Sequence, residues 1–172
     1  MFSKLEKWVE KIARKVFWQD IQAVRFTSQW DSHPTIGVVL DEGAKLPVRA
    51  HATDAGADLF CKHDFIVPAH DSVTIDTGVH VQLPKGTVGM VKSKSGLNVR
   101  SCITCEGVID EGYSGAIRLR VYNHGDYDYA FRAGDKVTQL VVVPVIYPSY
   151  VEVVEIAGGD RGDAGFGSTG RD

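Results

Sequence analysis

Several short stretches of this sequence combine small residues with groups that bind metal, phosphate or water. The first, TDAGADLF at residues 53–60, places the carboxylate of Asp58 after small residues and before Leu59 and Phe60. A carboxylate in this position either makes the ordinary hydrogen bonds of a turn or faces a hard cation such as Mg²⁺, which prefers oxygen ligands. The sequence alone leaves both interpretations of Asp58 open.

Two further stretches suit phosphate oxygens. KSKSGLN at residues 92–98 alternates cations and hydroxyl groups beside Gly96. Lysine supplies charge, serine supplies a directional donor, and glycine lets the backbone come close to an anion, although the same mixture is typical of a solvated turn. In AGDKVTQL at residues 133–140, Gln139 lies beside strand residues that face inward, and its amide can donate to a phosphate.

The stretch EGVIDEGYSG at residues 106–115 contains the best candidate for a general base. Asp110 follows two apolar residues and precedes a tight turn, which predicts a partly buried carboxylate with a fixed direction. Tyr113 can lie against a sugar or a base. Taken alone the stretch is weak support, because Asp-Gly and Gly-Asp turns are common in β proteins.

The C-terminal stretch DRGDAGFGSTG at residues 160–170 is rich in glycine, and Phe166 is its only large apolar residue. It has too little apolar surface to offset the entropy of ordering its own backbone. It is therefore either a frayed terminus or a lid that a ligand orders. If the stretch is a lid, phosphate groups can be bound by its glycines, Arg161, Ser168 and Thr169, while Phe166 can cover a flat ring.

The composition describes one soluble globular domain. The chain has 172 residues, of which 44% are hydrophobic and 24% charged, and its net charge of -3 gives no general attraction to nucleic acid. Three cysteines, an odd number, favour a reducing compartment, so we expect a cytoplasmic protein. Cys102 and Cys105 form a lone CxxC, which by spacing is half of a zinc or redox site, but no second pair exists.

The elements change character along the chain. Residues 2–18 show the apolar stripe of an amphipathic helix, which packs on the protein's own body, on a partner or on a membrane surface. The longest apolar stretch, at 140–147, is too short to cross a bilayer, and charged residues interrupt any secretion signal. From residue 36 the hydrophobic period is two with turns between the runs, which predicts an all-β barrel or double sheet without further helices. We therefore divide the chain into a helix and linker (1–35), a β-barrel (36–156) and a tail (157–172).

Taken in order, AGADL, KSGL, GVIDEGYSG, GDKVTQL and RGDAGFGSTG resemble the five motifs of the trimeric dUTPases, over about residues 36–170. The resemblance implies a distorted jelly-roll β-barrel, here with an N-terminal helical extension, that forms a homotrimer with shared active sites. It also implies hydrolysis of dUTP to dUMP and pyrophosphate with Mg²⁺. This reaction limits uracil incorporation into DNA and supplies dUMP for thymidylate synthesis.

The resemblance also implies a role for each motif residue. Asp58 would hold the metal through water, Asp110 would activate the attacking water, and Tyr113 would pack beneath the deoxyribose. Where the family usually has arginine, this chain has Lys94, which keeps the charge but loses the bidentate fork. The other implied substrate contacts are Lys94, Ser95, Gly96 and Gln139 for phosphates; Thr104, Gly107 and Ile109 for uracil; and Arg161, Phe166, Gly167, Ser168 and Thr169 in the closing tail.

Two alternatives remain at this point. A related dCTP deaminase shares the expected fold, but it needs a carboxylate in the strand after the third motif, and AIRLRVYN at 116–123 contains none. A non-catalytic β-barrel that senses nucleotides is compatible with the same fold, because fold does not fix function. Incubation with dUTP and Mg²⁺ distinguishes the two, because an enzyme releases pyrophosphate whereas such a sensor binds the nucleotide without turnover.

Overall fold

The computed structural model describes residues 35–156 and residue 158. The predicted N-terminal helix, at residues 2–18, and the glycine-rich tail lie outside these residues. The described part is built from strands and one short helix. The elements are β1 (Gly37–Leu40), β2 (Gly56–Phe60), β3 (Phe65–Val67), β4 (Ser72–Asp76), β5 (Val79–Gln82), β6 (Thr87–Ser93), α2 (Ser95–Ser101), β7 (Ile103–Thr104), β8 (Gly107–Ile109), β9 (Arg118–Asn123), β10 (Tyr129–Phe131) and β11 (Lys136–Pro144).

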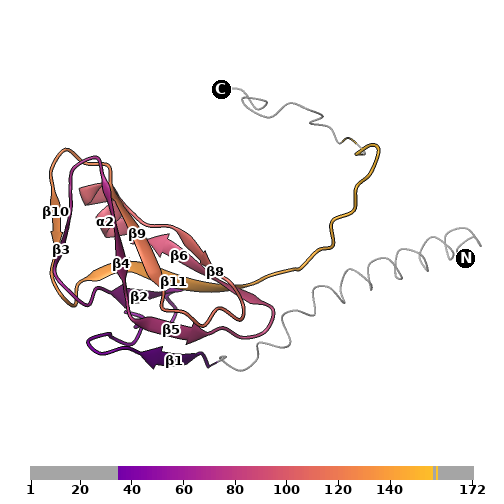
Figure 1. Cartoon of the computed structure of the whole chain (residues 1–172), viewed down its shortest axis with the longest axis horizontal. Helices are drawn as coiled ribbons and strands as arrows, with labels where there is room; N and C mark the ends of the chain where they lie inside the picture. The colour runs from indigo at the N-terminus through magenta and orange to yellow at the C-terminus, as the bar shows by residue number, and fades with distance from the viewer. Residues whose placement is uncertain (1–34, 157, 159–172) are drawn as a thin grey trace, which may run out of the picture.

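The strands form small antiparallel sheets that enclose one core (Figure 1). The largest sheet has the order β2-β11-β6-β8, and a second has the order β4-β9-β7. Two further pairs, β1 with β5 and β3 with β10, complete the described strands. Because β11 pairs with β2 on one side and β6 on the other, segments that are far apart in sequence meet along it.

The alternating pattern of the sequence explains these strands. In β9, Leu119 and Val121 are buried whereas Arg118 and Arg120 are exposed, as a period of two requires. The same alternation places Val79 and Val81 of β5 in the core. The rings of Phe65 on β3 and Phe131 on β10 stack with 4.7 Å between their centroids, and Phe131 is buried, so this strand pair also packs on the core. The mostly β architecture predicted from the sequence is therefore confirmed for the described residues.

The prediction that no helix follows residue 35 was wrong, because α2 directly follows Lys94. This helix has seven residues and buries none of them, so it leaves no apolar stripe in the sequence. It ends at Cys102, whose φ of 55° is the left-handed conformation common at helix C-termini. Among the described residues no helix is long and apolar enough to cross a membrane.

All three cysteines lie in the described part of the chain and are free thiols. Cys102 is exposed, whereas Cys61 and Cys105 are buried. Burial raises the pKa of the Cys105 thiol to about 11, so this group is protonated at neutral pH. A protonated thiol is not a nucleophile, which disfavours the redox interpretation of the CxxC pair.

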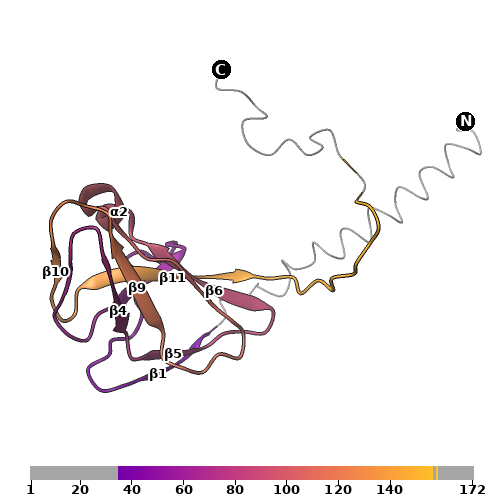
Figure 2. The same ribbon diagram turned by 45° about the horizontal axis from the view of Figure 1, so that its top comes forward.

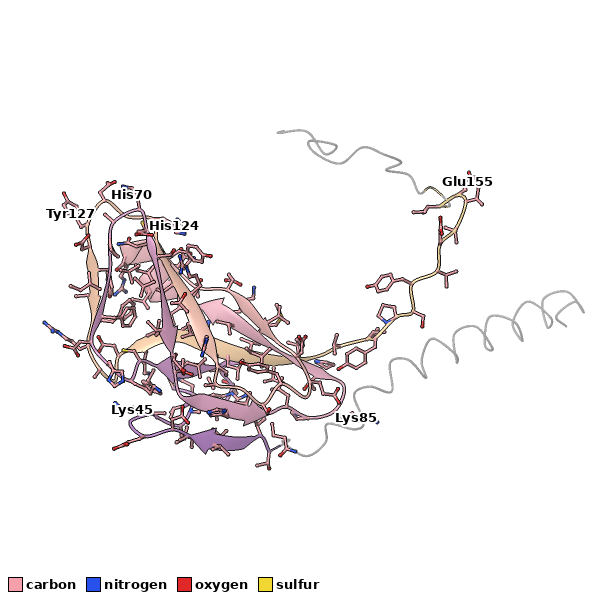
Figure 3. All side chains as sticks on the ribbon, in the orientation of Figure 1. Lys45, His70, Lys85, His124, Tyr127 and Glu155 are labelled. Atoms are coloured by element: carbon pink, nitrogen blue, oxygen red, sulfur yellow. The ribbon has the colours of Figure 1, made fainter. Side chains whose placement is uncertain are left out.

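The chain after β11 leaves the body of strands as an extended arm, residues 145–156 (Figures 1 and 2). Most of its large side chains are exposed, and Figure 3 shows Glu155 far from the strands. The exposed apolar members are Ile146, Tyr147, Tyr150, Val151, Val153, Val154 and Ile156. So much exposed apolar surface on one segment marks an interaction site.

Candidate nucleotide site

Asp58 lies on β2, the outer strand of the largest sheet, and backbone pairing holds it on both sides, with β11 on one side and an isolated bridge to Val48 on the other. Asp58 lies opposite Gln139 of β11, and the Asp58 N–H donates to the carbonyl of Val48 at 2.8 Å. Directly opposed residues of paired strands present their side chains on the same face. Asp58 and Gln139, which the sequence predicted separately, are thus brought together by the fold.

A β-bulge adds a third group to this face. The register between β11 and β2 shifts between Lys136 and Thr138, and Val137 and Thr138 are both buried. Without the extra residue, Lys136 and Gln139 would point to opposite faces, because they are three positions apart. With it, Lys136 Nζ lies 2.7 Å from Asp58 Oδ2. The sequence analysis assigned no role to Lys136, although it lies within the GDKVTQL motif.

The carboxylate of Asp58 is nearly buried and carries two lysine partners. Lys94 Nζ donates to Oδ1, and Lys136 Nζ contacts Oδ2. Burial alone would raise the pKa of Asp58, but the hydrogen bonds and charges of Lys136 and Lys94 together hold it below 3.8. The group is therefore an anion at neutral pH, and the three side chains carry a net positive charge that suits phosphate.

The end of β6 joins this charged group to the predicted base-binding turn. The Ser93 hydroxyl accepts from the Cys105 N–H at 2.9 Å, while the Ser93 carbonyl accepts from Gln139 Nε2 at 3.3 Å. Lys92, opposite Gln139 on β6, donates to Glu106 at 2.6 Å. The sequence placed Lys92 and Ser93 only in the phosphate-suited stretch at 92–98 and gave no role to Glu106, because the partners of these residues become visible only in the fold.

Ser95 and Gly96 begin α2, next to Lys94, and both are exposed. An added Cβ at Gly96 would meet open space rather than protein atoms. The predicted phosphate residues Lys94, Ser95, Gly96 and Gln139 are therefore gathered at one end of the β6–β11 pair, around Asp58.

The predicted uracil-binding turn runs along β6. Gly107 lies opposite Val91 and Ile109 opposite Gly89, and Ile109 is buried. Thr104 lies on β7, where its hydroxyl is 2.8 Å from His124 Nε2. The turn therefore has one end beside the Asp58 group and the other end at Asp110.

Asp110 follows β8 and is exposed, so the partial burial predicted for it is not present within a single chain. The reason is that β8 lies at the edge of its sheet. Asp110 borders a cavity of about 560 Å³, whose other lining residues are Thr87, Val88, Glu111, Gly112, Val145 and Tyr147. Tyr113, also exposed, donates its N–H to the Asp110 carbonyl at 3.1 Å and its hydroxyl to the Ala116 carbonyl at 3.1 Å.

The Asp58 and Asp110 groups are far apart within one chain. Asp58 is on the first strand of the β2-β11-β6-β8 sheet, and Asp110 follows the last. Asp110 lies level with Val88, whereas Asp58 lies level with Lys92. Three strand spacings and four residues of rise separate them by about 20 Å. Figure 3 labels His124 and Lys85, which lie well apart on the molecule.

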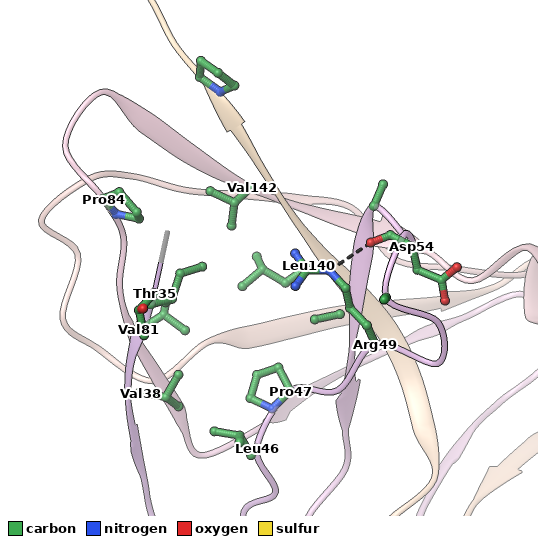
Figure 4. A pocket seen from close by; sticks show the side chains of 15 residues that line it. Thr35, Val38, Leu46, Pro47, Arg49, Asp54, Val81, Pro84, Leu140 and Val142 are labelled. Carbon is green, nitrogen blue, oxygen red and sulfur yellow. Dashed lines mark hydrogen bonds between the residues drawn. The ribbon is translucent and has the colours of Figure 1, made fainter. Parts of the chain in front are cut away.

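An apolar groove lies on another side of the described chain, between β1, β5 and β11 (Figure 4). Its volume is about 750 Å³, and its walls include Val38, Leu46, Pro47, Val81 and Val142. At its rim, Arg49 Nε donates to the Asp54 carbonyl at 2.9 Å. The predicted tail contacts Arg161, Phe166, Gly167, Ser168 and Thr169 lie outside the described residues.

The fold is mostly β and carries a cationic group with hydroxyl donors and, apart from it, an exposed carboxylate. Together these features define a class of protein, one that binds a phosphorylated ligand. A family model described as dUTPase matches residues 42–170. A deoxyuridine 5'-triphosphate nucleotidohydrolase of Clostridium acetobutylicum is 40% identical over 134 residues, covering 76% of this chain and 92% of that protein. The corresponding protein of Eremothecium gossypii is 39% identical over 142 residues, covering 81% and 93%.

Solved structures agree with the sequence comparisons. The dUTPase of Staphylococcus bacteriophage 80alpha with dUpNHpp has a TM-score of 0.74 and 30% identity, covering 79% of this chain and 98% of that chain. A variant dUTPase of phage phi11 of S. aureus, described with a structural Mg(II) ion, has a TM-score of 0.67 and 29% identity, covering 73% and 100%. The chain belongs to the dUTPase family.

Proposed function

We propose that this dUTPase hydrolyses dUTP to dUMP and pyrophosphate at sites that are shared between copies of the chain. The observation that carries the proposal is the separation of about 20 Å between Asp58 and Asp110 along the sheet. A general base must lie within hydrogen-bond reach of its water, directly beside the phosphate under attack. One copy therefore supplies the phosphate and metal group, and another supplies the base.

The Asp58 group fits Mg²⁺ held through water. Both carboxylate oxygens already have lysine partners, and the described residues contain no group of three or more His, Cys, Asp or Glu side chains that could hold the ion directly. Mg²⁺ keeps several waters and takes phosphate oxygens as ligands, so one carboxylate and the Gln139 amide suffice to orient its water shell. When bound, the ion would neutralise charge that develops on the phosphates.

The chain's own residues do the remaining work on the triphosphate. Lys94 and Lys136 offset its charge, and Ser95, Gly96 and Gln139 donate to or approach its oxygens. The open space beside Gly96 supports this role, because a ligand oxygen can come close to the backbone there.

At the other end of the shared site, Asp110 accepts a proton from the attacking water, which is directed at the α-phosphorus. The bond from that phosphorus to the bridging oxygen breaks, and pyrophosphate leaves. Tyr113 packs beneath the deoxyribose, where a 2'-hydroxyl would collide with its ring. Backbone groups between Thr104 and Ile109 bind uracil, whose donor and acceptor pattern is the reverse of that of cytosine.

The proposed assembly is a homotrimer of distorted jelly-roll barrels. The exposed apolar arm, residues 145–156, and the apolar groove in Figure 4 support association between copies, because each leaves apolar surface uncovered in a single chain. The glycine-rich tail then closes the site, with Phe166 stacked on uracil and Arg161, Gly167, Ser168 and Thr169 around the outer phosphates. The enzyme is expected in the cytoplasm, where it limits uracil in DNA and supplies dUMP for thymidylate synthesis.

Mixing two inactive variants tests the shared site. Asp58→Asn removes the metal-orienting carboxylate, and Asp110→Asn removes the base, so each variant alone should be nearly inactive. After denaturation and refolding together in equal amounts, random reassortment should restore about one quarter of the wild-type activity, since half of the copies supply each intact group. If both groups came from one copy, the mixture would stay as inactive as its components, and the shared site would be excluded.

The deaminase alternative receives no support from the described structure. Strand β9, which follows the third motif, carries Arg118, Arg120 and Tyr122 on its exposed face and no carboxylate. The reaction at C4 of cytosine requires such a group beside the base.

A further inference from the structure

His80, on the edge of the β1–β5 pair, lies between two hydrogen-bond acceptors. Its Nδ1 is 2.8 Å from the carbonyl oxygen of Ser114, and its Nε2 is 3.2 Å from Oδ1 of Asp41. Ser114 belongs to the loop of residues 112–115, between β8 and β9, whereas Asp41 follows β1. The imidazole ring thus connects two segments that are distant in the sequence.

The chemistry of the two partners fixes the charge of the ring. A backbone carbonyl only accepts hydrogen bonds, and a carboxylate is also an acceptor. A neutral imidazole has one N–H and can satisfy only one of the two, whereas the imidazolium ion donates from both nitrogens. The geometry therefore requires the protonated form of His80 if both contacts are made together.

The surrounding charges agree with a protonated ring. Asp41 contacts His80 directly, and Asp76, at the end of β4, also attracts its positive charge. Lys62 is the cation beside these carboxylates, 3.8 Å from Asp41 and 4.0 Å from Asp76. The Ser114 carbonyl, followed by Asp41 and Asp76, raises the pKa of His80 above its ordinary value of 6.5.

The loop of residues 112–115 has little else to hold it. Its other hydrogen bonds are local, from the Tyr113 N–H to the Asp110 carbonyl and from the Tyr113 hydroxyl to the Ala116 carbonyl. Among the described residues, the contact with His80 is the hydrogen bond that ties this loop to another strand. The neighbouring bond from the Ile117 N–H to the Val79 carbonyl places the two segments side by side.

We propose that His80 is a positioning residue for dUTP hydrolysis: as an imidazolium ion it fastens the loop of residues 112–115 to Asp41, and so holds Tyr113 in place beneath the deoxyribose. Both hydrogen bonds are made while the ring is protonated, and one of the two is lost as the pH rises through the pKa of the folded state, which breaks the connection between the loop and Asp41. The proposal rests on the role given above to Tyr113. Its expected signature is weaker dUTP binding at higher pH, with the hydrolytic step less affected.

The first test measures the ring itself. Nuclear magnetic resonance of the full-length protein labelled with ¹⁵N-histidine follows the imidazole nitrogens of His80, with the exposed His63 as reference. We expect the midpoint of His80 to lie above the ordinary histidine value of 6.5 and both of its ring nitrogens to carry protons below that midpoint. A His80 ring that is neutral at pH 6.5 would overturn the proposal.

The second test measures dUTP hydrolysis across the same pH range for the wild type, His80→Gln, Asp41→Asn and the control His63→Gln. For the wild type, KM should rise as the pH passes the midpoint found for His80. Below that midpoint, His80→Gln should raise KM about tenfold, the loss of one charged hydrogen bond, and should remove the pH step. Asp41→Asn should move the step to lower pH, and His63→Gln should behave as the wild type.

The two tests separate failure of the proposal from failure of the underlying role of Tyr113. A charged His80 together with an unchanged KM in His80→Gln would overturn the proposal by showing that the loop does not govern substrate binding. If the rise of KM with pH persisted in His80→Gln, that rise would belong to another titrating group, and the proposal would be overturned. Amide hydrogen exchange of residues 113–116 checks that His80→Gln loosens this loop and leaves the rest of the fold unchanged.

Discussion

Asp58 and Gln139 lie directly opposite each other on β2 and β11, and a bulge beside them turns Lys136 toward the same carboxylate. Neither strand alone would provide this arrangement, because side chains alternate faces along a regular strand. The bulge therefore sets the charge of the site as well as its shape. It brings a second cation to an anion that would otherwise face only Lys94.

Replacing Asp110 with asparagine should leave nucleotide binding largely intact and lower kcat by about 100-fold or more, as expected for loss of a positioned base. An amide of the same size keeps the shape but cannot take a proton. Steady-state kinetics and equilibrium binding of a non-cleavable dUTP analogue measure the two effects separately. Unchanged turnover would show that another group activates the water.

Gly56→Ala should displace the Gln139 side chain, because a Cβ at this position would overlap its amide group. We expect KM for dUTP to rise about tenfold, the effect of losing a hydrogen bond to a charged phosphate. Gly37→Ala is a matched control, since its Cβ would meet another glutamine, Gln82, at 3.2 Å on the β1–β5 pair. If both variants kept the wild-type KM, Gln139 would not contact the substrate.

Asp58 should make the protein sensitive to acid. Its lowered pKa stabilises the folded state at pH values above the unfolded pKa, and this contribution is lost as the pH falls through the folded pKa, below 3.8. Urea unfolding at about pH 7 and about pH 3 should show a smaller change for Asp58→Asn than for the wild type. Asp64, Glu106 and Glu111 also have lowered pKa values, but they are common to both proteins and cancel in the comparison.

Lys94→Arg should lower KM for dUTP about fivefold, a gain of ~1 kcal/mol, because a guanidinium group binds phosphate through two parallel N–H groups. Lys94 already points at the Asp58 carboxylate, so the longer side chain begins from the correct direction. Isothermal titration with a non-cleavable analogue gives the affinity. An affinity equal to that of the wild type would mean that Lys94 serves Asp58 rather than the substrate.

Deletion of residues 160–172 should abolish most activity and leave the thermal unfolding temperature nearly unchanged, because Phe166 is the only large apolar residue of this stretch up to residue 170. Calorimetry and a pyrophosphate assay on the same sample provide the comparison. A fall in stability that parallels the fall in activity would argue for a structural role instead of a lid.

The sequence predicted well what depends on local pattern. Burial alternates along β5 and β9, so their strands could be assigned from the spacing of Val79, Val81, Leu119 and Val121. The motif residues were identified by resemblance, and the fold brings Asp58, Lys94 and Gln139 together. Their individual roles stay predictions.

The features that the sequence did not predict depend on tertiary contacts. The helix α2 buries no side chain and therefore has no periodic signal. The bulge at Lys136 adds a single residue, which changes which face a side chain occupies without changing the composition of the strand. The distance between Asp58 and Asp110 follows from the order of strands in the sheet, which is set by pairing between distant segments.

The exposed thiol of Cys102 offers a practical route to watching the enzyme bind its substrate. It closes the short helix that begins beside Lys94, while the thiols of Cys61 and Cys105 are buried. A maleimide dye should therefore attach at one position per chain and report on the neighbourhood of the triphosphate without any engineered cysteine. Energy transfer between dyes on different copies would then follow the exchange of subunits in real time.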